Sequence, residues 1–180
     1  MALDTVQIVY NNLREEIVKR VELEHQIIYF TLLIFGAVLA VGLKSANTTI
    51  FLLYPVLIMF LAATWVDNQI RIGEISAYIK EKITPMLGED VVGWELALQN
   101  RFHAGFFGFR HILLTSIGKR ALFFGSQAIV IILIFPMATQ KSDSTTSIFF
   151  WIAVISTFIT FTLLALFQPP VKMPPEKPPI

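Results

Sequence analysis

The sequence predicts an all-α integral membrane protein in which four transmembrane helices form two hairpins with helical cytoplasmic extensions. Three observations lead to this prediction. Hydrophobic residues make up 55% of the 180 residues, whereas charged residues make up only 15%. The apolar residues gather in four long blocks that contain no Asp, Glu, Lys or Arg, and most basic residues lie outside the two shortest connections. A soluble helical bundle could bury one such uncharged helix, but hardly four in a chain of this length.

The four apolar blocks approach or match the roughly 20 residues with which a helix crosses a hydrocarbon core. They are 27–43, 50–66, 121–138 and 148–167. Because lipid offers the backbone no hydrogen-bond partner, each block is expected to be a helix. Short connections join the first block to the second and the third to the fourth, which predicts the hairpins 27–66 and 121–167.

The basic residues predict the orientation. Of the 14 lysine and arginine residues, 12 lie in segments 1–26, 67–120 and 168–180. The two short connections carry one each, Lys44 and Lys141. Since the side richer in Lys and Arg faces the cytoplasm, both termini and the central segment are predicted to be cytoplasmic in a multi-pass protein.

The N-terminal segment 1–26 is predicted to be an amphipathic helix. Its apolar residues recur at intervals of three and four: Val6, Val9, Leu13, Ile17 and Val21. Its polar face is rich in acidic residues, namely Glu15, Glu16, Glu22 and Glu24. Because acidic residues suit anionic lipid poorly, we expect this helix to pack on a partner helix instead of lying flat on headgroups.

The central segment 67–120 is predicted to be a cytoplasmic helical insert. The helical pattern of the second block continues through Ile83, and Pro85 is expected to end it. A helix from Ile50 to Ile83 would be about 50 Å long, so about 20 Å of it should project from a roughly 30 Å hydrocarbon core. A further helix is expected from Asp90 to Phe102.

The sequence shows no pattern typical of an enzyme. It lacks His-Glu-x-x-His, Gly-x-Ser-x-Gly and a phosphate-binding glycine loop. The absence of cysteine excludes disulfides and thiolate ligands. His103 and His111 are two helical turns apart, but no carboxylate accompanies them, so neither a metal nor another cofactor is expected. Carboxylates are also absent from the apolar blocks, which argues against pumps and most secondary transporters.

Neutral polar residues remain inside the last two apolar blocks. Ser156 and Thr160 are four residues apart and share a helix face, and Ser126 and Gln127 lie in the third block. Such side chains commonly mediate helix contacts in lipid. They can also line a pore, and Ser156 and Thr160 are the candidates for that role. Four helices are too few to enclose a pore alone, so a pore would require a symmetric homo-oligomer.

The stretch RFHAGFFGFRH, residues 101–111, is both basic and aromatic, and no acidic residue occurs from Leu96 to Ser142. Three explanations fit: a belt at the lipid interface, a subunit contact, or a site where arginine binds nucleic-acid phosphates and phenylalanine stacks bases. By themselves the residues favour the lipid belt. The ligand hypothesis names Arg101, Phe106, Phe107, Arg110, Lys119 and Arg120. In that hypothesis Gly105 and Gly108 let the backbone turn or approach the ligand.

The stretches WVDNQIRIGEISAYIKEKITP, 65–85, and GWE, 93–95, resemble small bacterial membrane effectors of antiphage operons that are paired with a nucleotidyltransferase, in particular the Hailong type. The resemblance implies an oligomeric channel of the bacterial inner membrane, with a tetramer favoured. It also implies that a single-stranded DNA oligomer holds the channel shut and that loss of the oligomer depolarises the membrane. It assigns no ligand-binding residue in this chain.

A different class of protein fits the same pattern: a non-catalytic accessory membrane protein that anchors or assembles a partner complex. Its contact would be the tail 168–180, QPPVKMPPEKPPI, which has six prolines in 13 residues and is expected to be extended. The tail could also be a simple spacer. A gene beside a nucleotidyltransferase would favour the channel, whereas a place in a bioenergetic operon would favour the accessory protein.

Overall fold

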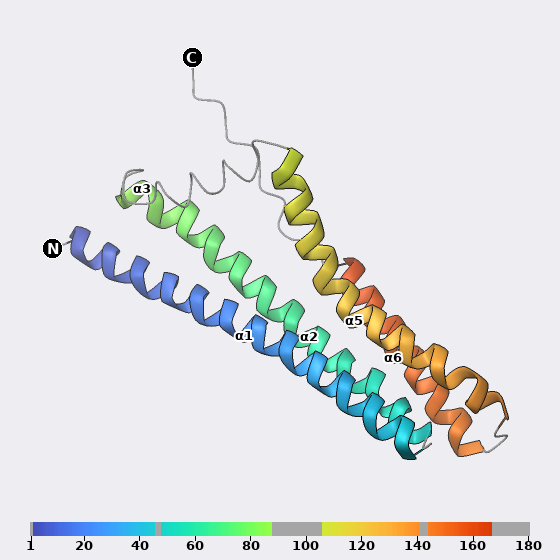
Figure 1. Ribbon diagram of the computed structural model, residues 1–180. Helices are drawn as coiled ribbons and strands as arrows, with labels where there is room; N and C mark the ends of the chain where they lie inside the picture. The colour runs from blue at the N-terminus through green and yellow to red at the C-terminus, as the bar shows by residue number, and fades with distance from the viewer. Residues whose placement is uncertain (1, 46–47, 88–105, 141–143, 167–180) are drawn as a thin grey trace.

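The computed structural model describes residues 2–45, 48–87, 106–140 and 144–166, and all of them are helical (Figure 1). The elements are α1 Ala2–Ser45, α2 Thr48–Tyr78, the π-helical turn η1 Ile79–Ile83, α3 Thr84–Leu87, α5 Phe106–Gln140 and α6 Ser144–Leu166. Within the described residues, 4 helices are long and apolar enough to cross a membrane: Asp4–Lys44, Thr49–Leu87, Gly118–Pro136 and Thr145–Leu166. The predicted all-α class is confirmed, and the chain has the helices of a multi-pass membrane protein.

Helix α2 is the central element of the bundle. It packs against α1, α5 and α6, and α5 also packs against α6. Helices α1 and α2 lie side by side, and together with η1 and α3 they extend past the end of α6 (Figure 1). Residues 4–20 and 70–87 therefore form a helix pair with its own small core, which we call the end pair.

The contact between α1 and α2 follows the alternating three- and four-residue spacing of a coiled coil. The inward residues of α1 include Tyr10, Leu13, Ile17, Glu24, Ile27 and Thr31. Those of α2 and η1 include Phe51, Ile58, Trp65, Asn68, Ile75 and Ile79. The expected packing of the N-terminal helix on another helix is thus present within the chain. Val9 and Val21 flank the contact and are 37% and 38% exposed. At Val9 the reason is that the neighbouring Tyr10 takes the inward position.

The two helices approach closely near their connection. Gly42 is buried, and the ring of Phe51 occupies the space in which a Cβ atom at position 42 would lie. A small residue at a helix contact lets two backbones come together in lipid. The aromatic ring of α2 therefore packs directly on the backbone of α1.

The prediction that Pro85 ends the helix is wrong by about one turn. Helical structure continues through α3 to Leu87, with Pro85 as its second residue. The wide turn η1 precedes it, and the backbone N–H of Thr84 donates to the carbonyl of Ile79, five residues earlier. Proline is tolerated in the first turn of a helix, since its missing N–H would have no partner there. The change of pitch lets the chain pass the proline while Ile79 and Ile83 both stay buried. The helix expected from Asp90 to Phe102 lies outside the described residues.

Candidate functional site: two polar layers inside the bundle

Glu24 is a buried carboxylate at the place where α1, α2 and α5 meet. Only 4% of the residue is exposed. Its Oε1 accepts a hydrogen bond from Lys119 Nζ at 2.6 Å and another from Trp65 Nε1 at 3.1 Å. Assigning Glu24 to the polar outer face of the helix was therefore wrong. The signal that identifies it is the heptad register, since Glu24 lies 14 residues after Tyr10 and seven before Thr31, both of which are buried.

Asn68 extends this layer between α1 and α2. Its Nδ2 donates to the backbone carbonyl of Arg20 at 2.8 Å, while the Arg20 guanidinium bonds Glu16 at 2.8 and 3.0 Å. Asn68 is buried, and its Oδ1 has no hydrogen-bond partner among the described residues. We call Glu24, Trp65, Asn68 and Lys119 the inner polar layer. Its ion pair joins α1 to α5, two helices that otherwise contact each other little.

A second polar set lies deeper, between α5 and α6. Gln127 and Thr160 are fully buried, and Gln127 Nε2 donates to Thr160 Oγ1 at 3.1 Å. Thr160 Oγ1 in turn donates to the carbonyl of Ser156 at 2.9 Å. With Ser126 and Ser156, which are also buried, these residues form the deep polar layer. Gln127 follows Lys119 by eight residues, which places this layer about 12 Å further along the helix.

The deep polar layer contains both residues predicted to line a pore. In the conformation described, the hydroxyls of Ser156 and Thr160 bond within the chain: Ser156 Oγ donates to the carbonyl of Ile152 at 2.8 Å. Gln127 Oε1, however, is buried and has no hydrogen-bond partner among the described residues. The layer thus keeps one buried amide oxygen whose hydrogen-bonding capacity the described chain does not meet.

The residues of the ligand hypothesis lie mainly along α5. Arg101 is outside the described residues, whereas Phe106, Phe107 and Arg110 belong to the first turns of the helix. Gly108 lies inside the helix, and Gly105 is outside the described residues. Lys119 belongs to the inner polar layer, and Arg120 borders a groove between α5 and α6.

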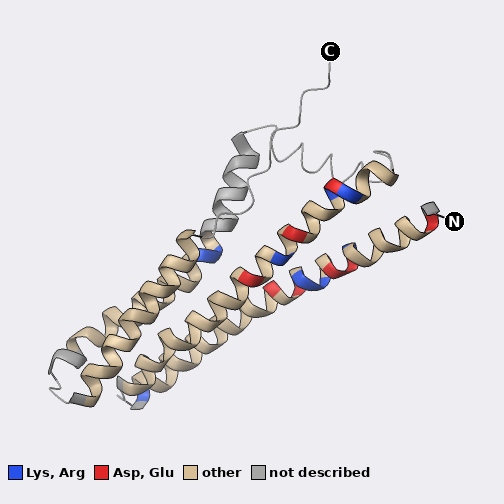
Figure 2. Ribbon diagram, turned by 180° about the vertical axis from the view of Figure 1, so that it is seen from behind, with Lys and Arg blue, Asp and Glu red and all other residues tan. Residues whose placement is uncertain are grey.

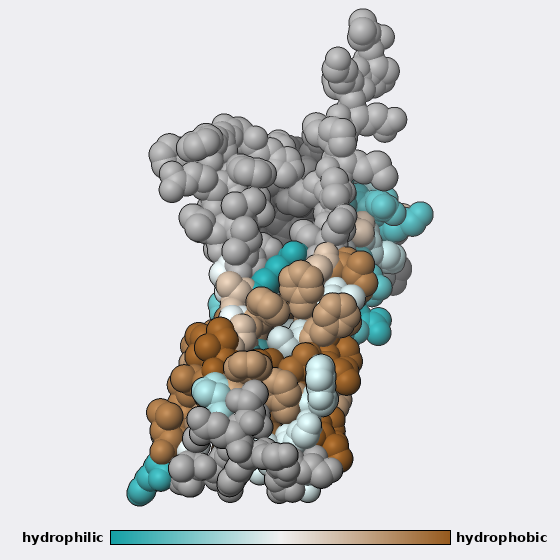
Figure 3. Space-filling model, turned by 90° about the vertical axis from the view of Figure 1, so that its right-hand side faces the viewer, coloured by the Kyte–Doolittle hydropathy of each residue, from teal (hydrophilic) through white to brown (hydrophobic). Residues whose placement is uncertain are grey.

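The surface changes character along the bundle. Charged residues of the described chain gather on the end pair and near the inner polar layer, whereas the rest of the spans carries almost none apart from Lys44 (Figure 2). In Figure 3, hydrophobic side chains predominate along both sides of the lower half of the visible face, and most hydrophilic ones gather above them on the right. The inner polar layer therefore marks the level at which an apolar surface gives way to a charged one.

Comparison of the chain with known protein families, with curated proteins and with solved structures finds no significant match. Its function is therefore inferred from the two polar layers and from the distribution of charge.

Proposed function

We propose that this chain forms a homo-oligomeric channel of the bacterial inner membrane that acts as an antiphage effector without a catalytic step. Its four apolar helices form two transmembrane hairpins, and a tetramer encloses the pore. Both termini and the end pair are cytoplasmic, in keeping with the bias of lysine and arginine. A single-stranded DNA oligomer, supplied by a partner nucleotidyltransferase, holds the channel shut, as the resemblance of the central segment implies. Its loss depolarises the membrane.

The observation that supports a channel best is the deep polar layer. Polar side chains inside membrane helices are costly and are often found along the paths of ions and substrates. Gln127 is a long amide whose buried Oε1 has no partner among the described residues, and its Nε2 donates to the Thr160 hydroxyl. Hydroxyls alone are common at plain helix contacts. A glutamine whose buried amide oxygen has no partner is a poor choice for packing and a useful one for a path that fills with water.

Helix α5 provides the link between ligand and pore in this proposal. The same continuous helix carries Phe106, Phe107 and Arg110 at its start, then Lys119, then Gln127. A rigid helix that shifts at its start must also shift at both polar layers. Release of the oligomer from the first turns of α5 would therefore disturb the Glu24–Lys119 ion pair and the Gln127–Thr160 bond together.

The conformation described corresponds in this proposal to the closed channel, because Thr160 is enclosed between α5 and α6. Opening would turn the hydroxyls of Ser156 and Thr160 towards the pore axis. The geometry also refines the ligand set. Lys119 is bonded to Glu24, so a DNA phosphate could bind it only by competing with that carboxylate. Arg101, Phe106, Phe107 and Arg110 therefore remain the principal ligand residues.

The ligand proposal is tested with Arg110→Glu and Phe107→Ala. Matched controls are Lys80→Glu and Tyr78→Ala, two exposed residues of the end pair. Each protein is purified in mild detergent, its mass is measured by mass photometry, and its bound nucleic acid is extracted and quantified. We expect the parent and both controls to retain an oligonucleotide, and the two test variants to lose it and become toxic to cells.

Two results would contradict the proposal. One is that both test variants purify as normal oligomers and contain as much nucleic acid as the parent. Absence of nucleic acid from all three proteins counts as the same result. The other is that the parent is a monodisperse monomer. Poor membrane insertion of both variants, with no change in nucleic acid, would instead support the lipid belt.

One observation favours the accessory protein as a second candidate. The end pair exposes large apolar side chains, among them Ile8, Val18 and Met86, which are 59%, 60% and 59% exposed. If the end pair is cytoplasmic, such residues suit contact with a partner protein. Co-purification of a stoichiometric partner that is lost in Val18→Asp, together with no ion flux in liposomes, would decide for this candidate.

A further inference from the structure

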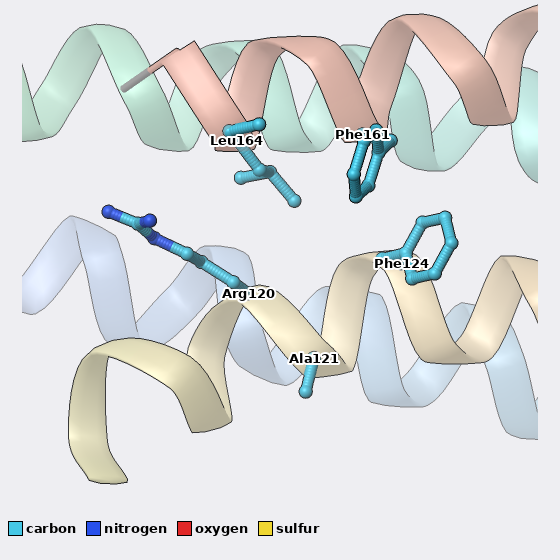
Figure 4. Close-up of a pocket in the computed structure, with 6 residues that line it drawn as sticks. Arg120, Ala121, Phe124, Phe161 and Leu164 are labelled. Carbon is cyan, nitrogen blue, oxygen red and sulfur yellow. The ribbon is translucent and has the colours of Figure 1, made fainter. Parts of the chain in front are cut away.

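An open apolar groove runs between α5 and α6 on the outside of the bundle (Figure 4). Its volume is about 270 Å³, and it is lined by Arg120, Ala121, Phe124, Phe161, Leu164 and Ala165. The rings of Phe124 and Phe161 meet at one end with their centroids 5.3 Å apart. The side chain of Arg120 extends away from the two rings, so its cationic group lies at the opposite end (Figure 4).

The groove combines one positive charge with an apolar floor. Arg120 is the one charged residue among the described residues that line it. Helix α6, residues 144–166, contains no charged residue, and α5, residues 106–140, contains no acidic one. The nearest cation on α5, Lys119, is bonded to Glu24. A negative group placed at Arg120 therefore meets no carboxylate from either helix that forms the groove.

The position of the groove indicates what covers it. Its lining residues lie at the ends of two candidate spans, close to Gly118 and Leu166. Lysine and arginine are most frequent on that side, which is the side predicted to face the cytoplasm. Arg120 is thus expected at the level of the headgroups of the inner leaflet, where anionic lipids attract basic side chains. Phe124 and Phe161 lie about one turn deeper, at the level of the acyl chains.

We propose that this groove binds an anionic phospholipid, with the phosphate on Arg120 and one acyl chain along Ala121, Phe124 and Phe161. The occupant matches the groove in charge, in apolar surface and in depth. This inference goes beyond the proposed channel and requires neither DNA nor ion flux. It gives Arg120 a lipid phosphate as its partner in place of the DNA phosphate expected from the sequence.

The test is native mass spectrometry of the detergent-purified protein with added dioleoyl-phosphatidylglycerol or dioleoyl-phosphatidylcholine. The two lipids share their acyl chains and differ in headgroup charge. We expect the parent to retain the anionic lipid about fivefold better, the effect of one cation at a lipid surface. Arg120→Gln should bring the two lipids to parity, whereas Arg120→Lys should keep the preference. Ala165→Leu fills the groove and should lower retention of both lipids.

Lys82→Gln is the control, because Lys82 is an exposed cation of the end pair, away from the groove. It should retain the lipids as the parent does. The proposal fails if the parent shows no preference, if Arg120→Gln keeps it, or if Ala165→Leu changes nothing. The proposal also fails if the oligomer retains no lipid and Ala165→Leu dissociates the oligomer. A second copy of this chain would then occupy the groove. Should Arg120→Gln not fold, Arg120→Lys and Ala165→Leu decide by the same criteria.

Discussion

In the end pair the core is apolar, formed by Tyr10, Ile79 and Ile83, and charged side chains such as Glu15 and Lys19 lie on the surface beside exposed apolar ones such as Ile8. In the spans the exposed surface is mostly apolar, and several polar side chains join a largely apolar core. Gln127 and Thr160 are fully buried, whereas large apolar residues point outward, among them Phe60, Phe135 and Phe158 at 61%, 56% and 69% exposure. The difference indicates the solvent around each region, because water rewards exposed charge, whereas lipid rewards exposed apolar groups.

The inner polar layer lies between these two regions. Glu24 and Lys119 are charged like the surface of the end pair, but the carboxylate is buried like the polar groups of the spans. A buried ion pair contributes little net stability compared with apolar residues, yet breaking it is expensive because one charge is left alone. The inner polar layer therefore fixes the position of α1 relative to α5 at the level where the apolar surface gives way to the charged one.

The largest effect is expected at this junction. Lys119→Met leaves the Glu24 carboxylate buried without its cation and should destabilise the fold by about 4 kcal/mol. The double variant Glu24→Gln with Lys119→Met should recover at least half of that loss, because glutamine can still accept from Trp65. Thermal unfolding in detergent, followed by near-UV circular dichroism, measures both. The control is Arg71→Met, which removes an exposed pair with Glu74; if it costs as much, the junction has no special role.

A smaller loss is expected in the apolar core of the end pair. Ile79→Ala should cost about 3 kcal/mol, since it removes a buried side chain from a contact between two helices. The loss should be confined to the end pair. Hydrogen exchange is therefore expected to accelerate in residues 4–20 and 70–87 but not in the spans. Ile70→Ala, at a 44% exposed position, serves as the control. Equal acceleration in the spans would show that the two regions are one unit.

A substitution in the deep polar layer should lower stability only slightly but lower ion conductance strongly. Thr160→Val leaves Gln127 Nε2 without its acceptor and should cost about 1 kcal/mol. If Thr160 lines the open pore, the same change lowers ion flux through reconstituted liposomes while the oligomer stays intact. Thr162→Val is the control, because the Thr162 hydroxyl is exposed and bonds only the carbonyl of Phe158 among the contacts described. Loss of the oligomer with unchanged flux per oligomer would make Thr160 a packing residue.

The smallest effect is expected from the surface pair of Glu15 and Lys19, 2.9 Å apart. The hydrogen bond and charge of Lys19 lower the pKa of Glu15, and those of Glu15 raise the pKa of Lys19. A lowered carboxyl pKa gives a stabilisation that is present above the unfolded pKa and lost as the pH falls through the folded one. The raised Lys19 pKa gives a stabilisation that is lost only as the pH rises through it.

Glu15→Gln should therefore change the melting temperature slightly at pH 7, and the change should shrink as the pH falls through the lowered pKa of Glu15 or as salt screens the pair. Differential scanning fluorimetry of the parent, Glu15→Gln and Glu22→Gln measures the difference. A shift at pH 7 as large as that of Thr160→Val would mean that the end pair does not lie in water.

The local sequence determined the helical class, the four apolar helices and the inward face of the N-terminal helix near Leu13 and Ile17. These features depend on composition and on three- and four-residue spacing, both of which act over one or two turns. It also located the cations of α5 and the hydroxyls of α6. The same local reasoning failed at Pro85, where a wide turn changes the effect of a proline.

Only the tertiary structure decided which polar groups meet. Glu24 and Lys119 are 95 residues apart in the chain, and Gln127 and Thr160 are 33 apart. Spacing within one helix tells which residues share its face, but not which residue of another helix stands opposite. That depends on the packing and register of α1, α2, α5 and α6, in which a single missing Cβ at Gly42 admits the ring of Phe51. This packing brings Glu24 and Lys119 to the same level. Glu24, which was expected in water, therefore becomes a buried partner of Lys119 on α5.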